Sequence, residues 1–266
     1  MNKISVVAIA ASSLCFSCSF PSFATQNEIT IGIADLNDYG DEFIGIEYKR
    51  YLADVQADKD PFLISPYLNK TDSIFVRYFG VNGFDRYELG GEFFIDDKWV
   101  VNGQLRYGDY SSDYSFRDSY VSVNVDTGYF VTPHWQVGGG LLYEYQDASV
   151  YGDHLSDNQT TARVFGRYTN IAQGRGWDVA MVALVDDTTR IEVDARYFFN
   201  RRFSASLAYL TEISTDEYAY TESDVAELTV DYWFTPGWSL QAGAGVYTAG
   251  DESGLAAITL STSLRF

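Results

Sequence analysis

The chain ends in Leu255-Ala256-Ala257-Ile258-Thr259-Leu260-Ser261-Thr262-Ser263-Leu264-Arg265-Phe266, and this stretch decides the fold. Counted back from Phe266, every second residue is apolar except for one threonine, and the residues between them are mostly polar. Alternation with a period of two over about ten residues is typical of a β-strand with one apolar and one polar face. The end of the chain is therefore predicted to be a strand of this kind.

The composition of the whole chain suits β-structure. Of the 266 residues, 46% are hydrophobic and 17% aromatic, with 21 Tyr, 18 Phe and 22 Gly but only 5 Pro. Aromatic residues are enriched in strands, and glycine in tight turns. The mean hydropathy of −0.14 is too polar for a bundle of membrane helices. It fits a membrane barrel, because barrel strands are apolar on one face only.

The first residues form a separate segment. Lys3 gives a positive start, an apolar run follows, and Ser22-Phe23-Ala24 offers the small-x-small pattern of a signal-peptidase site. A membrane anchor is disfavoured because the apolar run is short, and a lipoprotein site at Cys15 or Cys18 lacks the expected small residues before it. The predicted division is a signal peptide at 1–24 and one barrel domain at 25–266, which contains no cysteine.

Short turns flanked by aromatic residues recur along the chain. Each has two or three aromatic or apolar residues, a tight polar turn and one more aromatic residue. Amphipathic rings prefer the headgroup level of a membrane, so the repeat favours a membrane barrel over a soluble β-sandwich. The repeat spans residues 93–99, 129–135, 197–203 and 232–238, with a related turn at 173–177.

The spacing predicts an all-β, antiparallel up-and-down transmembrane barrel of about fourteen strands, with both ends periplasmic. Longer polar connections at 108–118, 149–158 and 214–224 are expected to be outer loops. The connection at 53–70 fits least well, because it is long on the side that should have short turns. Two hidden strands there, or a merger of two strands, would change the count to about 16 or 12. The expected strands are 28–37, 42–52, 71–81, 84–95, 99–109, 119–131, 135–147, 158–170, 177–186, 189–199, 203–214, 223–234, 238–248 and 254–266.

The connection also carries a family resemblance. Asp60-Pro61-Phe62-Leu63-Ile64-Ser65-Pro66-Tyr67-Leu68-Asn69-Lys70 resembles the proline-containing connection of a porin family of Gram-negative outer membranes. The strand rhythm, the aromatic turns and the final Leu264-Arg265-Phe266 extend the similarity over most of the chain. The resemblance implies a pore in the bacterial outer membrane, with Leu264 and Phe266 as a signal read by the barrel-assembly machinery. It implies no catalytic residues.

Several expected strands set an apolar face against a charged one. Arginine or lysine on the lipid face near the bilayer midplane costs about 2–4 kcal/mol. Several such costs in one barrel would be intolerable, so the charged faces are predicted to point inward. The predicted pore-lining residues are Arg77, Arg86, Glu88, Glu92, Arg106, Arg163, Arg167, Glu192, Arg196 and Asp231.

A charged interior allows two interpretations, a closed barrel held by internal ion pairs or a water-filled channel. About eight strands leave room for side chains alone, whereas roughly 16–18 leave an aqueous channel. A barrel of fourteen strands is closer in size to the barrels with an aqueous channel, and no loop is long enough to be an obvious plug. The sequence therefore favours a porin for passive diffusion of small hydrophilic solutes and ions, with the closed structural or adhesive barrel as the alternative.

The expected outer loops are rich in aspartate and glutamate, which predicts weak cation selectivity. No cofactor is expected, although calcium or magnesium could bridge this acidic rim to lipopolysaccharide. A net charge of −19 argues against nucleic acid as a partner.

An outer-membrane barrel hydrolase is a less favoured alternative. His134 lies in a short turn, and Asp153-His154 only superficially resembles the rim residues of omptin-like proteases. The sequence leaves the oligomeric state open.

Overall fold

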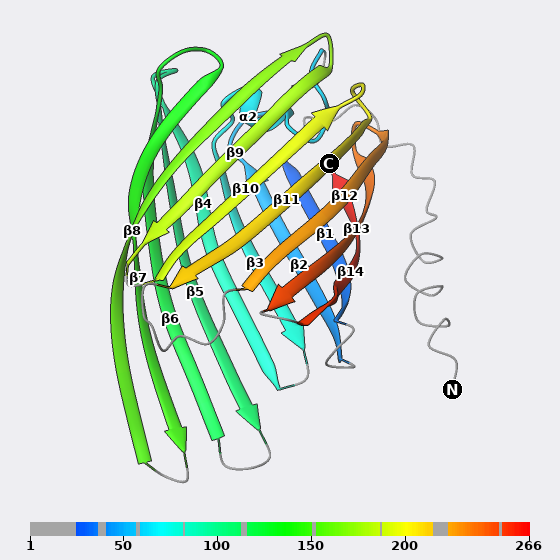
Figure 1. Cartoon of the computed structure of the whole chain (residues 1–266). Helices are drawn as coiled ribbons and strands as arrows, with labels where there is room; N and C mark the ends of the chain where they lie inside the picture. Colours follow the sequence, from blue (N-terminus) through cyan, green and yellow to red (C-terminus); the bar gives the residue numbers. More distant parts are fainter. Residues whose placement is uncertain are drawn as a thin grey trace, which may run out of the picture.

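Fourteen antiparallel strands close into one barrel in the computed structural model of the chain (Figure 1). The structure describes residues 25–36, 41–56, 59–81, 83–112, 116–150, 153–186, 188–214, 223–249 and 252–266. The predicted signal peptide lies outside these residues. The strands are β1 (Asn27–Leu36), β2 (Asp41–Tyr51), β3 (Ser73–Val81), β4 (Phe84–Ile95), β5 (Trp99–Ser112), β6 (Phe116–Phe130), β7 (Trp135–Val150), β8 (Asp153–Ala172), β9 (Arg175–Val185), β10 (Thr188–Phe198), β11 (Phe203–Ser214), β12 (Ser223–Thr235), β13 (Trp238–Ala249) and β14 (Glu252–Arg265).

Each strand pairs with its neighbours in the chain, and β1 pairs with β14 to close the sheet. The closing register sets Glu28 opposite Arg265 and Asp35 opposite Ile258. The backbone oxygen of Phe266 also accepts hydrogen bonds from the amides of Gln26 and Asn27. The all-β, antiparallel barrel predicted from the sequence is confirmed, with fourteen strands rather than about 12 or 16.

The alternation along the strands separates an outer apolar face from an inner polar one. On β12, Leu228 is 57% exposed while its neighbour Thr229 is 8% exposed, and the buried Asp231 follows after one more residue. Successive side chains of a strand point to opposite faces of the sheet. Leu228 therefore faces outward, and Thr229 and Asp231 face the lumen.

Replacing Leu228 with arginine tests this assignment. We expect Leu228→Arg to destabilise the inserted barrel by about 2–4 kcal/mol, because it places a charge against lipid in the middle of a strand. Thr229→Arg on the adjacent position should be tolerated, because its side chain enters the lumen near Glu227. The stability of both variants is measured by urea titration in lipid vesicles, with the folded fraction read from the heat-modifiable band on a gel. Equal losses of stability in the two variants would contradict the assignment of faces.

Outward aromatic rings form a girdle at the end of the barrel where Phe266 lies, which we call the C-terminal end. The ring centroids are 4.8 Å apart in Trp99–Tyr129, 4.9 Å in Trp135–Tyr168 and 4.3 Å in Phe234–Trp238. All of these rings except Tyr168, which lies within β8, come from the short aromatic turns that the sequence picks out. A girdle at one level of the barrel is the arrangement that a membrane interface favours.

A second group of outward tyrosines lies toward the opposite end. Tyr87 is 5.3 Å from Tyr78 and 6.5 Å from Tyr107, measured between ring centroids. Tyr107 follows Trp99 by eight residues on β5, which is about 26 Å along a strand at ~3.3 Å per residue. Because the strands of a membrane barrel tilt by about 35–45°, this length corresponds to roughly 20 Å of barrel height, close to the apolar band of about 25 Å.

Two of the expected outer loops are largely strand. β5 and β6 stay paired as far as Ser112 opposite Phe116, and β7 and β8 as far as Val150 opposite Asp153. The predicted loops at 108–118 and 149–158 are therefore wrong, because the backbone ladder continues although the side chains there are polar. The barrel wall is consequently taller along β6, β7 and β8 (Figure 1). The third expected loop, at 214–224, lies mostly outside the described residues.

Candidate functional site in the barrel interior

The connection between β2 and β3 turns into the barrel. Residues 53–56 and 59–71, here called the inward segment, contain the short helix α2 (Ser65–Leu68) with a proline in its first turn. Figure 1 places α2 inside the ring of strands at the C-terminal end. Pro61, Phe62, Ile64 and Ser65 are buried. The expectation that no connection is long enough to act as a plug is therefore wrong. No helix in the described part of the chain has the length and apolar character to cross a membrane.

One half of the inward segment is anchored through Phe62. Its amide donates to the backbone oxygen of Arg201 (3.0 Å), and its own oxygen accepts from Nη1 of Arg265 (3.0 Å). The Phe62 ring meets the buried Trp233 edge-on, with centroids 6.1 Å apart. The Arg201 guanidinium lies 4.8 Å from the centroid of the Phe62 ring. Strands β12 and β14 and the β10–β11 turn therefore hold this half in place.

The other half is anchored through Tyr67. Its ring lies 3.5 Å from the guanidinium carbon of Arg167, and its hydroxyl donates to Oε1 of Gln136 (2.7 Å). Its ring also contacts Phe94 and Phe130, with centroids 6.1 and 6.0 Å away. Burial raises the pKa of Tyr67 to about 12, so the hydroxyl remains a donor at neutral pH. The inward segment thus contacts strands on opposite sides of the lumen.

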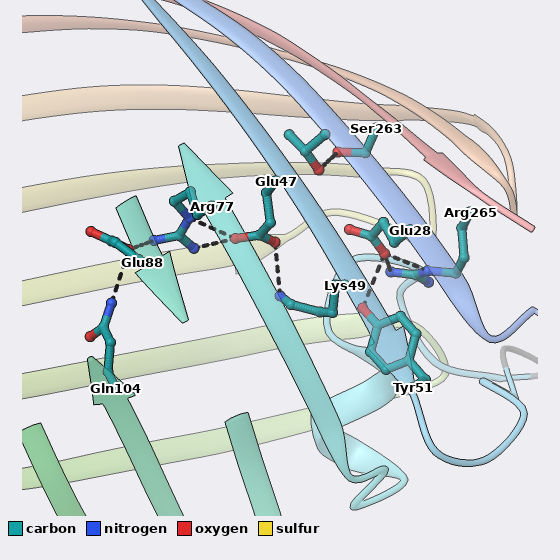
Figure 2. Close-up of polar contacts among 10 residues, drawn as sticks. Glu28, Glu47, Lys49, Tyr51, Arg77, Glu88, Gln104, Ser263 and Arg265 are labelled. Atoms are coloured by element: carbon teal, nitrogen blue, oxygen red, sulfur yellow. Dashed lines mark hydrogen bonds and ion pairs between the residues drawn. The ribbon is translucent and has the colours of Figure 1, made fainter. Parts of the chain in front are cut away.

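A buried ion pair joins the first and last strands and contacts the inward segment at Phe62. Nε of Arg265 donates to Oε2 of Glu28 at 2.7 Å, and the hydroxyl of Tyr51 donates to the same oxygen at 3.0 Å (Figure 2). The Arg265 guanidinium lies 4.7 Å from the centroid of the Trp233 ring. The Arg265 side chain is only 2% exposed. This group links barrel closure to the position of Phe62.

Four predicted pore-lining residues meet on the wall formed by β3, β4 and β5. Glu88 is the centre, with its carboxylate 3.0 Å from Nη1 of Arg77, 3.0 Å from Nε of Arg86 and 3.7 Å from Nε of Arg106. Arg77 also donates from Nε to Glu47 on β2 (2.7 Å) (Figure 2). Two further residues complete this cluster, Lys49 beside Glu47 and Gln104 beside Glu88.

Of the other predicted residues, Glu92 lies on β4 in the same wall, and the rest are distributed over β8, β10 and β12. Arg163 pairs with Asp126 (3.1 Å), and Arg167 makes two 2.8 Å hydrogen bonds to Asp178. Arg196 donates to two serine hydroxyls, and Asp231 is buried. Glu92 and Glu192 make no ion pair within the described residues.

Several interior partners escape the sequence prediction. Glu47 and Lys49 lie two residues apart on β2, and Asp126 and Asp178 each stand at an inward position of a strand. Period-two alternation could have found all four, because they share the parity of polar neighbours on their strands. Phe62 and Tyr67 had no such signal, because they lie outside the strands.

The predicted assembly residues lie at the closing seam. Leu264 stands opposite Ile29 on β1 and Trp238 on β13. The Phe266 side chain is exposed at the end of the barrel. Both therefore belong to the outer face, and their part in assembly stays a prediction.

His134 has a structural contact in its turn, where Nδ1 lies 2.9 Å from the backbone oxygen of Thr169. The side chains of Asp153 and His154 lie outside the described residues. Within the described part of the chain, no three His, Cys, Asp or Glu residues group as metal ligands. A cation site at the outer rim therefore stays a proposal, and much of that rim falls outside the description.

Comparison with known proteins identifies structures that share this fold. No protein-family model matches the chain, and no curated protein matches it in sequence. Solved structures do match. The outer membrane protein Omp33 of Acinetobacter baumannii is 15% identical, with a TM-score of 0.67 over 91% of this chain and 98% of that one. The fold is that of a porin-like outer-membrane β-barrel.

Two channels share this porin-like fold at lower similarity. The CymD monoaromatic hydrocarbon channel is 9% identical, with a TM-score of 0.56 over 92% of this chain and 89% of that one. A deletion mutant of the TodX monoaromatic hydrocarbon channel is 10% identical, with a TM-score of 0.50 over 91% and 90%. At these identities the likeness concerns the fold, and the fold predicted from the family resemblance is confirmed.

Proposed function

We propose that this protein is an outer-membrane channel for the passive diffusion of small hydrophilic solutes and ions. The observation that carries the proposal is the charged inner face of a closed barrel of fourteen strands. A barrel of about eight strands is filled by side chains alone, whereas this one has a wider interior. The arginines of these pairs keep part of their side chains exposed, 31% for Arg77, 16% for Arg163 and 25% for Arg167. Exposed guanidinium groups on the inner face favour polar solutes over apolar ones.

The inward segment limits this channel at the end that we expect to be periplasmic. Phe62 and Tyr67 are anchored on different strands around the lumen, so the segment crosses the mouth instead of lying along one wall. Solutes must therefore pass beside it or displace it. This supports a narrow channel, and it also makes the closed barrel a stronger alternative than the sequence suggested.

A channel for apolar solutes is less consistent with the interior. CymD is described as a monoaromatic hydrocarbon channel, and Phe75 and Phe79 do face the lumen here. The guanidinium carbon of Arg77 lies 5.1 Å from the Phe75 centroid and 5.7 Å from the Phe79 centroid. The two rings are therefore partly covered by a charged group. An apolar solute would have to displace the Arg77 guanidinium to reach them.

We expect the channel to be weakly cation-selective at low salt. Inside the barrel the arginines are largely matched by carboxylates, so the excess of acid lies at the outer rim, with Asp147 and Asp157 among its described residues. Its field extends about 10 Å at 0.1 M salt, so small cations are concentrated at the mouth. The reversal potential across a planar bilayer in a salt gradient measures this preference.

Two variants make the selectivity test sharper. Replacing Asp147 and Asp157 with asparagine should reduce the preference for cations. Arg163→Gln should increase it, because Asp126 then loses its cation. A reversal potential that indicates anion selectivity of the unmodified protein at low salt would contradict the role given to the rim. The same bilayers would show a closed barrel by the absence of conductance.

The proposal includes a location and partners. A porin-like barrel with an outward aromatic girdle fits the bacterial outer membrane, where lipid and lipopolysaccharide surround it. The proposed route to this membrane is export by a cleaved signal peptide at 1–24. The barrel-assembly machinery then recognises Leu264 and Phe266.

A further inference from the structure

A cavity of about 250 Å³ lies on the lumen side of the inward segment. Leu63, Ile64 and Pro66 of that segment line it, together with residues from two facing walls of the barrel. Pockets for drug-sized ligands have volumes of about 300–1,000 Å³, so this one suits a smaller molecule. Its charged lining residues are Lys49 on β2, Glu92 on β4, Arg167 on β8, Asp178 on β9 and Arg196 on β10.

Three of these charges already have close partners. Arg167 and Asp178 form a bidentate pair, and Tyr67 stacks on the same guanidinium. Lys49 lies 3.2 Å from the carboxylate of Glu47. These groups keep the site polar, but most of their charge is balanced within the protein.

Glu92 and Arg196, in contrast to these three residues, have no ion-pair partner among the described residues. The Glu92 carboxylate makes no hydrogen bond or ion pair with any described residue, although Arg167 and Lys49 are near enough to attract it. Arg196 uses Nη1 and Nη2 for single hydrogen bonds of 3.0 Å to the hydroxyls of Ser204 and Ser206. A guanidinium has five N–H donors, so Arg196 has donors to spare. No carboxylate of the described residues forms an ion pair with it, although Asp194 and Asp231 are near enough to attract it.

We propose that this cavity binds a small zwitterion, with its ammonium group at Glu92 and its carboxylate at Arg196. This rests on the proposed channel function and gives it a solute class, amino acids with a neutral apolar side chain. The two unpaired groups have opposite charge and belong to strands on different sides of the lumen. A ligand with one charge satisfies one of them, whereas a zwitterion satisfies both, and ion-assisted hydrogen bonds are the stronger ones. Leu63 and Ile64 offer an apolar floor for the side chain.

The test is isothermal titration calorimetry of the folded full-length barrel in detergent with three matched probes. L-leucine carries both charges, isocaproate lacks the ammonium group and isoamylamine lacks the carboxylate. We expect saturable binding of L-leucine and binding at least about tenfold weaker for each single-charge analogue, a difference of ~1.4 kcal/mol. Equal affinity for isocaproate and L-leucine would identify a simple anion site and overturn the proposal. An absence of leucine binding would overturn it as well.

Variants connect the binding to the two residues. Glu92→Gln should weaken leucine binding but leave isocaproate binding unchanged, and Arg196→Gln should weaken both. Arg196→Lys keeps the positive charge and should retain part of the affinity, which guards against a loss of fold in the glutamine variant. Arg190→Gln is the control, because Arg190 shares the inner face of β10 but pairs with Glu212 outside the cavity. Unchanged leucine affinity in both Glu92→Gln and Arg196→Gln would contradict the proposed site.

The binding test and the channel test fail separately. A protein that conducts ions but does not bind L-leucine contradicts the zwitterion site and leaves the channel in place. A protein that binds L-leucine but never conducts contradicts the channel and leaves the binding site in place.

Discussion

Replacing the inward segment with a tight turn should raise the single-channel conductance severalfold. The segment crosses the mouth of the barrel, and β2 and β3, which it connects, are hydrogen-bonded to each other up to the two ends of the segment. The last ladder pair is Tyr51 opposite Ser73, and the amide of Leu52 donates to the backbone oxygen of Asp72 (2.8 Å). An Asn-Gly turn can therefore connect Leu52 to Asp72 without disturbing β2 or β3. Asp72 is kept because its carboxylate accepts from the amide of Phe94.

A milder variant guards against misfolding of the shortened chain. Phe62→Ala combined with Tyr67→Ala keeps the chain length but removes both aromatic anchors, so the segment should become mobile and the conductance more variable. Tyr129→Ala is the matched control, because it removes an outward ring of the girdle without touching the segment. Conductance that stays unchanged in both the shortened and the alanine variants would mean that the segment does not limit the path.

Replacing Arg265 with leucine should cost about 3–5 kcal/mol of stability, because it leaves the buried Glu28 carboxylate without its cation. The same substitution removes a hydrogen bond to the oxygen of Phe62. We therefore expect both a lower urea midpoint of the folded barrel and a looser inward segment. Refolding in detergent without the assembly machinery separates this effect from any role of the chain end in assembly.

Arg50→Leu is the control for this effect. Arg50 lies on β2 near the same end of the barrel, but it is exposed, and its hydrogen bonds go to Asn27 and Gln26. Exposed substitutions of this kind usually change stability by about 0.5 kcal/mol or less. If Arg265→Leu and Arg50→Leu shift the urea midpoint equally, the buried pair contributes nothing particular to stability. The double variant Glu28→Leu with Arg265→Leu should recover much of the loss, because no unpaired charge remains.

The fold could be predicted because its constraints are local and repeated. The alternation that ends at Phe266 has a period of two, and lipid on one side and polar lumen on the other give every strand the same pattern. The aromatic turns recur because one membrane interface meets every short turn. In such a barrel even Arg77, Glu88 and Arg163 can be assigned to a face from parity alone.

The position of the inward segment inside the barrel could not be predicted in the same way. Phe62-Leu63-Ile64 is an ordinary apolar run in a connection, and nothing near it in the chain indicates where it packs. Its position depends on Arg265 and Trp233, which lie far away in sequence and meet it only after the barrel closes. The ion-pair partners have the same origin, because Arg167 selects Asp178 through the register of β8 with β9.

The measurement that tests the central claim most directly is the single-channel conductance of the refolded protein in a planar bilayer. The account predicts discrete current steps for the unmodified protein and larger steps once Asn-Gly replaces the inward segment. Bilayers that contain folded, inserted protein but show no current for either form would contradict a water-filled interior and identify a closed barrel.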